Sequence, residues 1–298
     1  MALGDSMIIP PGFCQRSIAT TLGSMVYYTP EVTLNTSEAA SNLVFLHGFG
    51  GGSSAYEWSQ VFPAFAFSHR VLAPDLIGWG RSDHPAVNYR VADYVTMITQ
   101  FLEQTCPEPV AVVASSLTAA MTIRAAIARP ELFKCLILAT PAGLSDFGEN
   151  YTRSLFANLV KTPFLDRLIY SVGIATREGI RTFLEQRQFA RPERIFPEIV
   201  EAYLASAQQP NAEYAALSFV RGDLCFDLAL DMPQLKTPTA IFWGKKSQFT
   251  SPEIGRKLAD LNPQAVRVFQ EVEDVGLTPH LEQPALAIAL IQRYLNIL

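Results

Sequence analysis

Short apolar runs of strand type alternate with longer segments of helical periodicity, and this alternation constrains the fold more than any other feature of the chain. Apolar runs predict buried strands at residues 42–46, 70–73, 109–114, 136–140, 239–243 and 266–269. Helical spacing of apolar residues predicts helices over 91–104, 117–128 and 284–295. Strands that alternate with crossover helices are typical of a mostly parallel sheet. The sequence therefore predicts an α/β fold, opened by a hairpin at 15–20 and 24–28.

The alternation stops between about Asn150 and Asp227, where only helical periodicity remains. Leu155 and Leu159 share one helical face, and Thr176 with Glu178 in the first turn forms a suitable N-terminal cap. A structureless stretch of about 80 residues is uncommon in a compact domain. We therefore expect an all-helical insertion over 145–236, within a core formed by 1–144 and 237–298.

Composition excludes several classes of function. The formal net charge is −5 and the Lys and Arg residues are scattered, which argues against nucleic-acid binding. The four cysteines show no CxxC spacing and no metal pattern with histidine, and no dinucleotide fingerprint occurs, so we expect no metal and no cofactor. The N-terminus lacks the order of a secretory signal, and the apolar runs are too short to span a bilayer. A cytoplasmic location is expected, with peripheral membrane contact through the apolar middle segment left open.

Six segments, in this order, carry a resemblance to a known family: VFLHGFGGG, VLAPDLIGWGRSDHP, the tight turn at 114–118, ARPELFKCLILATPAG, IFWGKKSQFTSP and DVGLTPHLEQP. Together they resemble the α/β-hydrolase superfamily over residues 42–144 and 237–298. The resemblance implies a mostly parallel twisted sheet flanked by helices. It also implies that the helical insertion is the cap, or lid, of that family.

The family places its nucleophile in a G-x-S-x-G turn between a strand and a helix. Here the turn is Ala114-Ser115-Ser116-Leu117-Thr118, which aligns Ser116 with the nucleophile and puts a threonine where the family has a small glycine. The resemblance also implies an oxyanion hole formed by the N–H groups of Phe49 and Leu117. The alternative interpretation of Ser116 or Ser115 is a helix N-cap hydroxyl.

Two members of the family's triad are missing at the aligned positions. The acid position in the pattern W-G-x-x-D holds Ser247, and the histidine position in the last loop holds Leu277. Loss of the histidine in a comparable triad costs about 10⁶-fold in turnover. An unassisted serine hydroxyl is a weak nucleophile at neutral pH. The sequence therefore predicts a degenerate triad.

His280 and Asp146 are the candidate substitutes for the missing base and acid. The leading hypothesis is a catalytically inert pseudo-hydrolase, which binds a hydrophobic small molecule between core and cap or a protein partner on its surface. The alternative is a serine ester or thioester hydrolase with a displaced triad of Ser116, His280 and Asp146. A purely structural subunit of a larger assembly is a third hypothesis.

Overall fold

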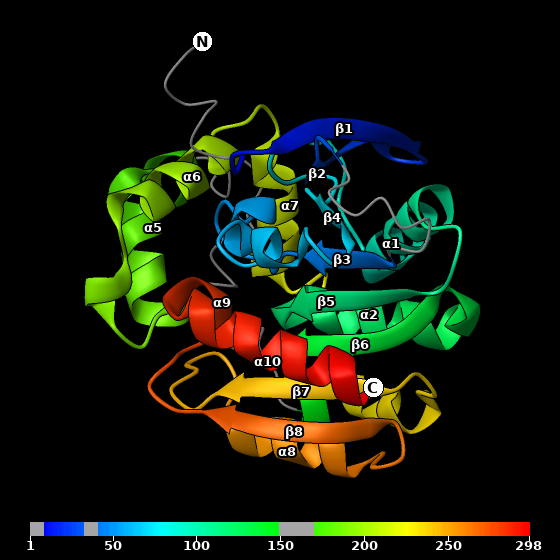
Figure 1. Cartoon of the computed structure of the whole chain (residues 1–298). Helices are drawn as coiled ribbons and strands as arrows, with labels where there is room; N and C mark the ends of the chain where they lie inside the picture. Colours follow the sequence, from blue (N-terminus) through cyan, green and yellow to red (C-terminus); the bar gives the residue numbers. More distant parts are fainter. Residues whose placement is uncertain (1–8, 33–40, 149–169) are drawn as a thin grey trace.

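The core of the protein is an eight-stranded sheet (Figure 1). The computed structural model describes residues 9–32, 41–148 and 170–298. The strand order across the sheet is β1-β2-β4-β3-β5-β6-β7-β8. β1 pairs antiparallel with β2, and β2 with β4, whereas all the other neighbours are parallel. The strands are β1 (Phe13–Thr20), β2 (Gly23–Pro30), β3 (Asn42–Leu46), β4 (Arg70–Pro74), β5 (Val110–Ser115), β6 (Phe133–Ala139), β7 (Thr239–Gly244) and β8 (Val266–Val272).

The central strands are mostly apolar because both faces of the sheet are covered. Alternate residues of a strand point to opposite faces. In β3, Val44 and Leu46 belong to one apolar cluster, whereas Leu43 and Phe45 belong to the other. A near-continuous apolar run is what a parallel strand buried on both faces requires.

Helices supply the two covering layers. Residues of α1 (Val91–Thr105), α2 (Ser116–Ala128) and α8 (Pro252–Asp260) pack in the first cluster. Residues of α10 (Pro284–Ile297) pack in the second cluster, and this helix crosses in front of the sheet in Figure 1. The short helix α9 (Pro279–Glu282) comes directly before α10. The carboxyl ends of the parallel strands therefore meet at one edge, where ligands of open α/β sheets usually bind.

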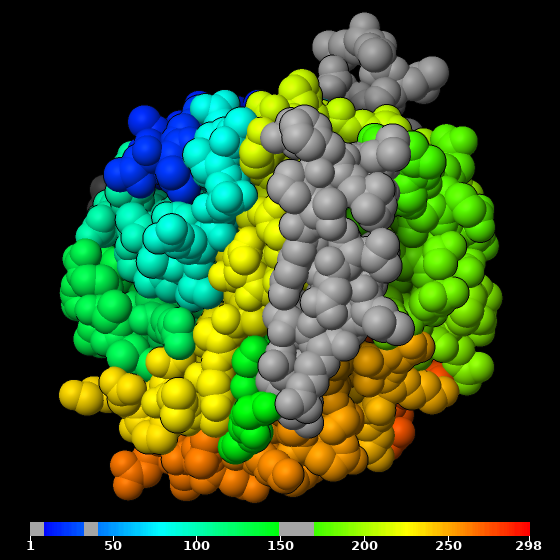
Figure 2. All heavy atoms as spheres, turned by 180° about the vertical axis from the view of Figure 1, so that it is seen from behind, coloured from blue at the N-terminus to red at the C-terminus, as the bar shows by residue number. Residues whose placement is uncertain are grey.

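The described residues between β6 and β7 form α5 (Arg177–Phe183), α6 (Pro197–Ala207), α7 (Ala212–Arg221) and several single-turn helices, with one isolated bridge from Leu144 to Phe226. We call residues 170–236 the cap. From behind (Figure 2), the yellow stretch that includes α7 lies against the cyan part of the core, where the Tyr89 N–H donates to Ser218 Oγ over 3.1 Å. The predicted helical face at Leu155 and Leu159 lies outside the described residues.

The predicted fold class is confirmed, and most predicted elements differ from the observed ones only at their ends. The strand predicted at 42–46 has those bounds, whereas β6 begins at Phe133 rather than at residue 136. Thr176 is the N-cap of α5, and its side chain accepts the Gly179 N–H. The short helix α9 was not predicted. Within the described ranges, no helix has the length and apolar character that a membrane crossing needs.

Candidate active site

Ser116 lies at a strained turn between a central strand and a buried helix. β5 ends at Ser115 and α2 begins at Ser116. The φ of Ser116 is 54°, in the left-handed region. For a residue other than glycine, such a conformation costs on the order of 1–3 kcal/mol. Ser115 is the N-cap residue, but its side chain makes no capping hydrogen bond. The geometry therefore fits a nucleophile elbow better than a capped helix start.

The two residues that flank the turn are fully buried. Ala114 and Thr118 are 0% exposed. The Thr118 carbonyl accepts the Thr122 hydroxyl over 2.8 Å, whereas Thr118 Oγ1 has no hydrogen-bond partner within the described residues. The threonine is thus accommodated in a regular helix, at the cost of one unpartnered buried hydroxyl.

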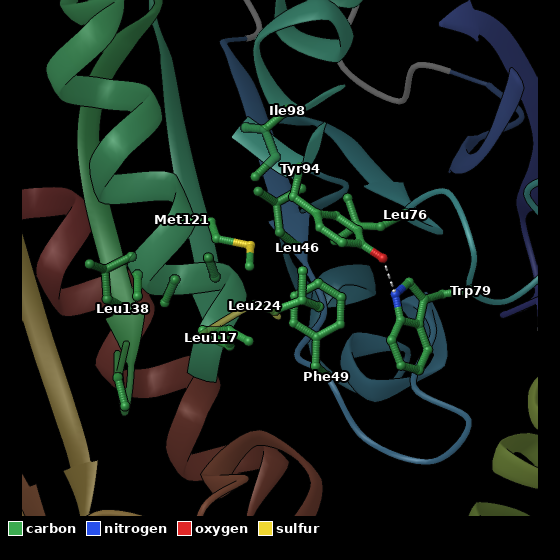
Figure 3. Close-up of a cluster of buried hydrophobic side chains, with 14 of the residues drawn as sticks. Leu46, Phe49, Leu76, Trp79, Tyr94, Ile98, Leu117, Met121, Leu138 and Leu224 are labelled. Carbon is green, nitrogen blue, oxygen red and sulfur yellow. Dashed lines mark hydrogen bonds between the residues drawn. The ribbon is translucent and has the colours of Figure 1, made fainter. Parts of the chain in front are cut away.

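The side chains of the two predicted oxyanion-hole residues are anchored in the core (Figure 3). The Phe49 ring packs against Trp79 and Tyr94, with centroid distances of 5.1 and 4.7 Å, and Leu117 lies in the same cluster. The first N–H groups of a helix have no intrahelical acceptor, and Leu117 is the second residue of α2. This arrangement leaves backbone donors beside the elbow for a ligand oxygen.

The predicted acid and histidine positions lie on two adjacent loops. The Lys246 N–H donates to the Val275 carbonyl over 3.0 Å, which joins the loop after β7 to the loop after β8. Ser247 Oγ is buried and has no hydrogen-bond partner in the described part of the chain. Leu277 is 3% exposed, and its N–H donates to the Gln188 carbonyl of the cap over 2.8 Å. A buried apolar side chain therefore occupies the position at which the sequence predicted the family's base.

Three of the four histidines form hydrogen bonds with groups other than Ser116. His47 is fully buried; its Nδ1 donates to the Gly48 carbonyl, and its Nε2 accepts the Leu76 N–H over 3.0 Å. His69 Nδ1 pairs with Ser68 Oγ, and His84 Nε2 donates to the Gly80 carbonyl. None of these imidazoles makes a hydrogen bond to Ser116 in the described structure.

His280, the proposed substitute base, stacks on Trp58. The two rings are 3.8 Å apart at an angle of 12°. His280 Nε2 lies 3.8 Å from Glu57 Oε2, and neither ring nitrogen has a hydrogen-bond partner in the described residues. Burial lowers the pKa of His280, which favours the neutral form of the imidazole. The structure thus brings His280 to Glu57, not into hydrogen-bond contact with Ser116.

Asp146, the proposed substitute acid, holds the chain where it leaves the core for the cap. Its carboxylate accepts the N–H groups of Gly143 and Leu228 over 2.9 and 2.8 Å. Burial raises its pKa to about 6. No hydrogen bond or ion pair joins Asp146 to His280 in the described structure, so the proposed trio is not assembled in this conformation.

Glu57 is a charged residue of the site that sequence reasoning missed. It lies in the single-turn helix Ala55–Trp58 and is 1% exposed. Its carboxylate accepts the Gly48 N–H over 2.8 Å and the Tyr203 hydroxyl of the cap over 3.0 Å. The available signal was a lone glutamate among Ala55, Tyr56 and Trp58, a charge within an apolar segment.

The last loop is fastened to the cap by a buried carboxylate, Glu282. Its side chain is 0% exposed and accepts the N–H groups of Gly276 and Ala190, the latter over 2.9 Å. Arg194 Nη1 lies 3.5 Å from the same carboxylate. Because Gly276 belongs to the loop and Ala190 to the cap, Glu282 ties the two segments together.

Asp274 adds an ionic connection at the rim. Its carboxylate pairs with Arg191, Arg194 and Lys246 over 2.8 to 2.9 Å. Hydrogen bonds from Lys246 and Arg191 hold the pKa of Asp274 well below its ordinary value. The loop in which the family carries its histidine is therefore an anchor for the cap in this protein.

Comparison with known proteins gives one family. The sequence model of the Alpha/beta hydrolase family matches residues 43–290. Lipase 1 of Psychrobacter immobilis is 26% identical over 272 residues, which are 90% of this chain and 79% of the lipase. A strigolactone esterase of Pisum sativum is 38% identical over 115 residues, which are 37% of this chain and 42% of the esterase.

Solved structures agree in fold. A serine hydrolase involved in carbazole degradation superposes with a TM-score of 0.75 at 18% identity, over 96% of this chain and 100% of that one. Carboxylesterase from Bacillus subtilis gives a TM-score of 0.73 at 15% identity, over 98% and 94% of the two chains. At these identities the likeness concerns the fold alone.

Proposed function

Because the chain belongs to the alpha/beta hydrolase family, we propose that it is a member that keeps the serine elbow without the acid–base relay. It binds an apolar small molecule under the cap rather than hydrolysing it through Ser116. This protein is then a pseudo-hydrolase, in which the ancestral reaction has become a recognition event.

One observation carries the proposal: none of the four histidines makes a hydrogen bond to Ser116, and a buried leucine occupies the aligned position. Acyl transfer needs a base within hydrogen-bond reach of the attacking hydroxyl. A leucine cannot accept a proton at any pH. Without a base, the oxyanion hole and binding contribute only residual rate assistance.

Aromatic residues of the cap and the loop after β7 support an apolar ligand. Phe249 follows Ser247 on that loop, and its ring lies 6.3 Å from that of Phe183 and 6.4 Å from that of Phe219. A Cβ placed on Gly50 would lie 2.9 Å from the Phe183 ring, so this ring abuts the oxyanion loop. Backbone donors beside aromatic side chains suit a carbonyl group on an apolar body.

The proposal is tested with a fluorophosphonate probe and p-nitrophenyl butyrate. We expect the purified protein to remain unlabelled at Ser116, with ester turnover no greater than that of Ser116→Ala. Labelling that Ser116→Ala removes, together with turnover above that variant, would overturn it. Equilibrium binding of 2-naphthyl methyl ketone supplies the positive readout. If this probe does not bind and a protein co-purifies in stoichiometric amounts, a protein partner replaces the small molecule.

A serine ester or thioester hydrolase is the second candidate, and the position of His280 favours it. Its ring nitrogens are buried without partners, and Glu57 lies 3.8 Å away as an available acid. A change in loop conformation could bring this pair to Ser116, with Glu57 in the role first considered for Asp146. This candidate predicts p-nitrophenyl ester turnover that His280→Ala abolishes and Asp146→Asn leaves unchanged.

A further inference from the structure

Glu57 is a buried carboxylate without a cationic partner in the described residues. Its only ion-pair contact in that set is His280 Nε2 at 3.8 Å, a separation too long for a direct hydrogen bond. Two neutral donors, the Gly48 N–H and the Tyr203 hydroxyl, bind its oxygens. Burying a charge that no opposite charge compensates is costly, so such residues are candidates for a functional role.

The neighbouring groups favour the charged form of Glu57. Burial by itself raises the pKa of this carboxyl, but His280, His47 and Ser53 outweigh it and bring the pKa below its ordinary value. The hydrogen bonds that the Gly48 N–H and the Tyr203 hydroxyl donate to the carboxylate also favour its charged form.

This charge lies next to the elbow. A Cβ placed on Gly48 would be 3.4 Å from Glu57 Oε2, 3.4 Å from Ser116 Cβ and 3.1 Å from Ser115 Oγ. The carboxylate and the elbow serine therefore face each other across Gly48, whose neighbour Phe49 is the predicted oxyanion donor. Ser115 Oγ is buried without a hydrogen-bond partner in the described structure. This hydroxyl can therefore form a hydrogen bond with a polar group of a ligand.

We infer that Glu57 is a specificity-determining residue that restricts the ligand to uncharged carbonyl compounds, such as esters, lactones and ketones, and excludes free carboxylic acids. The inference rests on the proposed ligand site under the cap. Repulsion between two neighbouring like charges, at the effective dielectric of a protein interior, reduces affinity by a factor on the order of ten or more. The same charge disfavours an oxyanion at Ser116, which agrees with a site that binds without turnover.

The experiment compares methyl 2-naphthylacetate with 2-naphthylacetate at pH 7.5, by calorimetric titration of the full chain. Wild type should prefer the ester. Glu57→Gln should lower the ester-to-acid affinity ratio by about tenfold or more. The matched control is Glu108→Gln, an exposed carboxylate in the α1–β5 connection, which should leave the ratio unchanged. Tyr203→Phe removes one hydrogen bond to Glu57 but keeps the charge, and should not lower the ratio.

A titration of wild type at high salt concentration separates the effect of the buried Glu57 charge from the effect of the net charge of the chain. Long-range repulsion by a net charge of −5 is screened in 0.5 M NaCl, whereas the repulsion by a buried carboxylate persists. The wild-type preference should therefore survive at high salt. Three results would overturn this inference but not the proposed function. They are equal affinities of wild type for ester and acid, an ester-to-acid affinity ratio that stays unchanged in folded Glu57→Gln, and a fall of that ratio in Tyr203→Phe as large as in Glu57→Gln. If neither probe binds, the ligand site of the proposed function is overturned as well.

Discussion

The elbow and the last loop, residues 273–278, are held in place by different kinds of contact. At the elbow, Ser116 keeps a φ of 54° at the start of α2. In the last loop, Leu277, at the position predicted for the base, is buried, and its N–H donates to the carbonyl of the cap residue Gln188. One region has a strained backbone that a central strand and a buried helix hold in place. The other is a loop that hydrogen bonds fasten to the cap.

Under the proposed function, this difference teaches that backbone geometry and side-chain chemistry can be lost independently. The elbow is fixed by a central strand and a buried helix, so its backbone cannot relax without repacking the core. A catalytic side chain on a loop makes fewer packing contacts, and its replacement by leucine even adds buried apolar surface. Glu282 and Asp274 then hold the altered loop against the cap.

The largest expected effect is a gain of activity. If only the acid and the histidine of the triad are missing, Ser247→Asp combined with Leu277→His should restore them. The rate of p-nitrophenyl butyrate hydrolysis should then rise at least about 10²-fold, because positioned acid–base groups contribute a factor of this size. The same pair of changes in a Ser116→Ala background is the control and should stay inactive. A folded double variant without activity would mean that the elbow has drifted too, with Thr118 as the first suspect.

The second prediction concerns the loop as an anchor. Glu282→Ala should lower the free energy of unfolding by about 3 kcal/mol, because it leaves the buried N–H of Gly276 and the partly buried N–H of Ala190 without an acceptor. Urea denaturation measures this change. Glu193→Ala, which removes an exposed ion pair with Arg191, should stay within about 0.5 kcal/mol of wild type. Equal losses in both variants would contradict an anchoring role for the buried carboxylate.

The third prediction separates a structural from a catalytic Asp146. In the folded protein its pKa of about 6 lies above the ordinary 3.8. The protonated carboxyl therefore makes its full contribution to the free energy of unfolding below pH 3.8, and this contribution is lost as the pH rises through 6. Between pH 4.5 and 7.0, wild type should lose about 2 kcal/mol of unfolding free energy relative to Asp146→Asn, which does not titrate. Urea curves at both pH values check this. A difference independent of pH would refute the raised pKa.

The smallest expected effect tests the strain at the elbow. Ser116→Gly should raise the unfolding free energy by about 0.5 kcal/mol, because glycine adopts a positive φ without steric cost. Ser115→Gly is the matched control. Ser115 has an extended φ of −123°, so glycine there should destabilise by about 0.5 kcal/mol. Thermal unfolding followed by circular dichroism resolves the two signs, and the same sign in both variants would argue against stored strain.

Local patterns predicted the elements well and the contacts between them poorly. The strand at 42–46 and the helix N-cap residue Thr176 are determined by residues close in sequence, and both were predicted correctly. The hydrogen bond from the Tyr203 hydroxyl to the Glu57 carboxylate joins residues 146 positions apart, and no local sequence pattern predicts it. The stacking of His280 on Trp58 depends in the same way on distant packing. The carboxylate nearest to His280 was therefore missed.

The sequence by itself determined the fold class, the position of the elbow and the absence of an acid at residue 247 and a base at 277. Periodicity and residue type are written locally, and a leucine has no titratable group in any conformation. Only the tertiary structure decided that a buried Glu57 faces the elbow and that the last loop anchors the cap. Those facts depend on which distant surfaces pack together, because burial and proximity determine the effect of a charge.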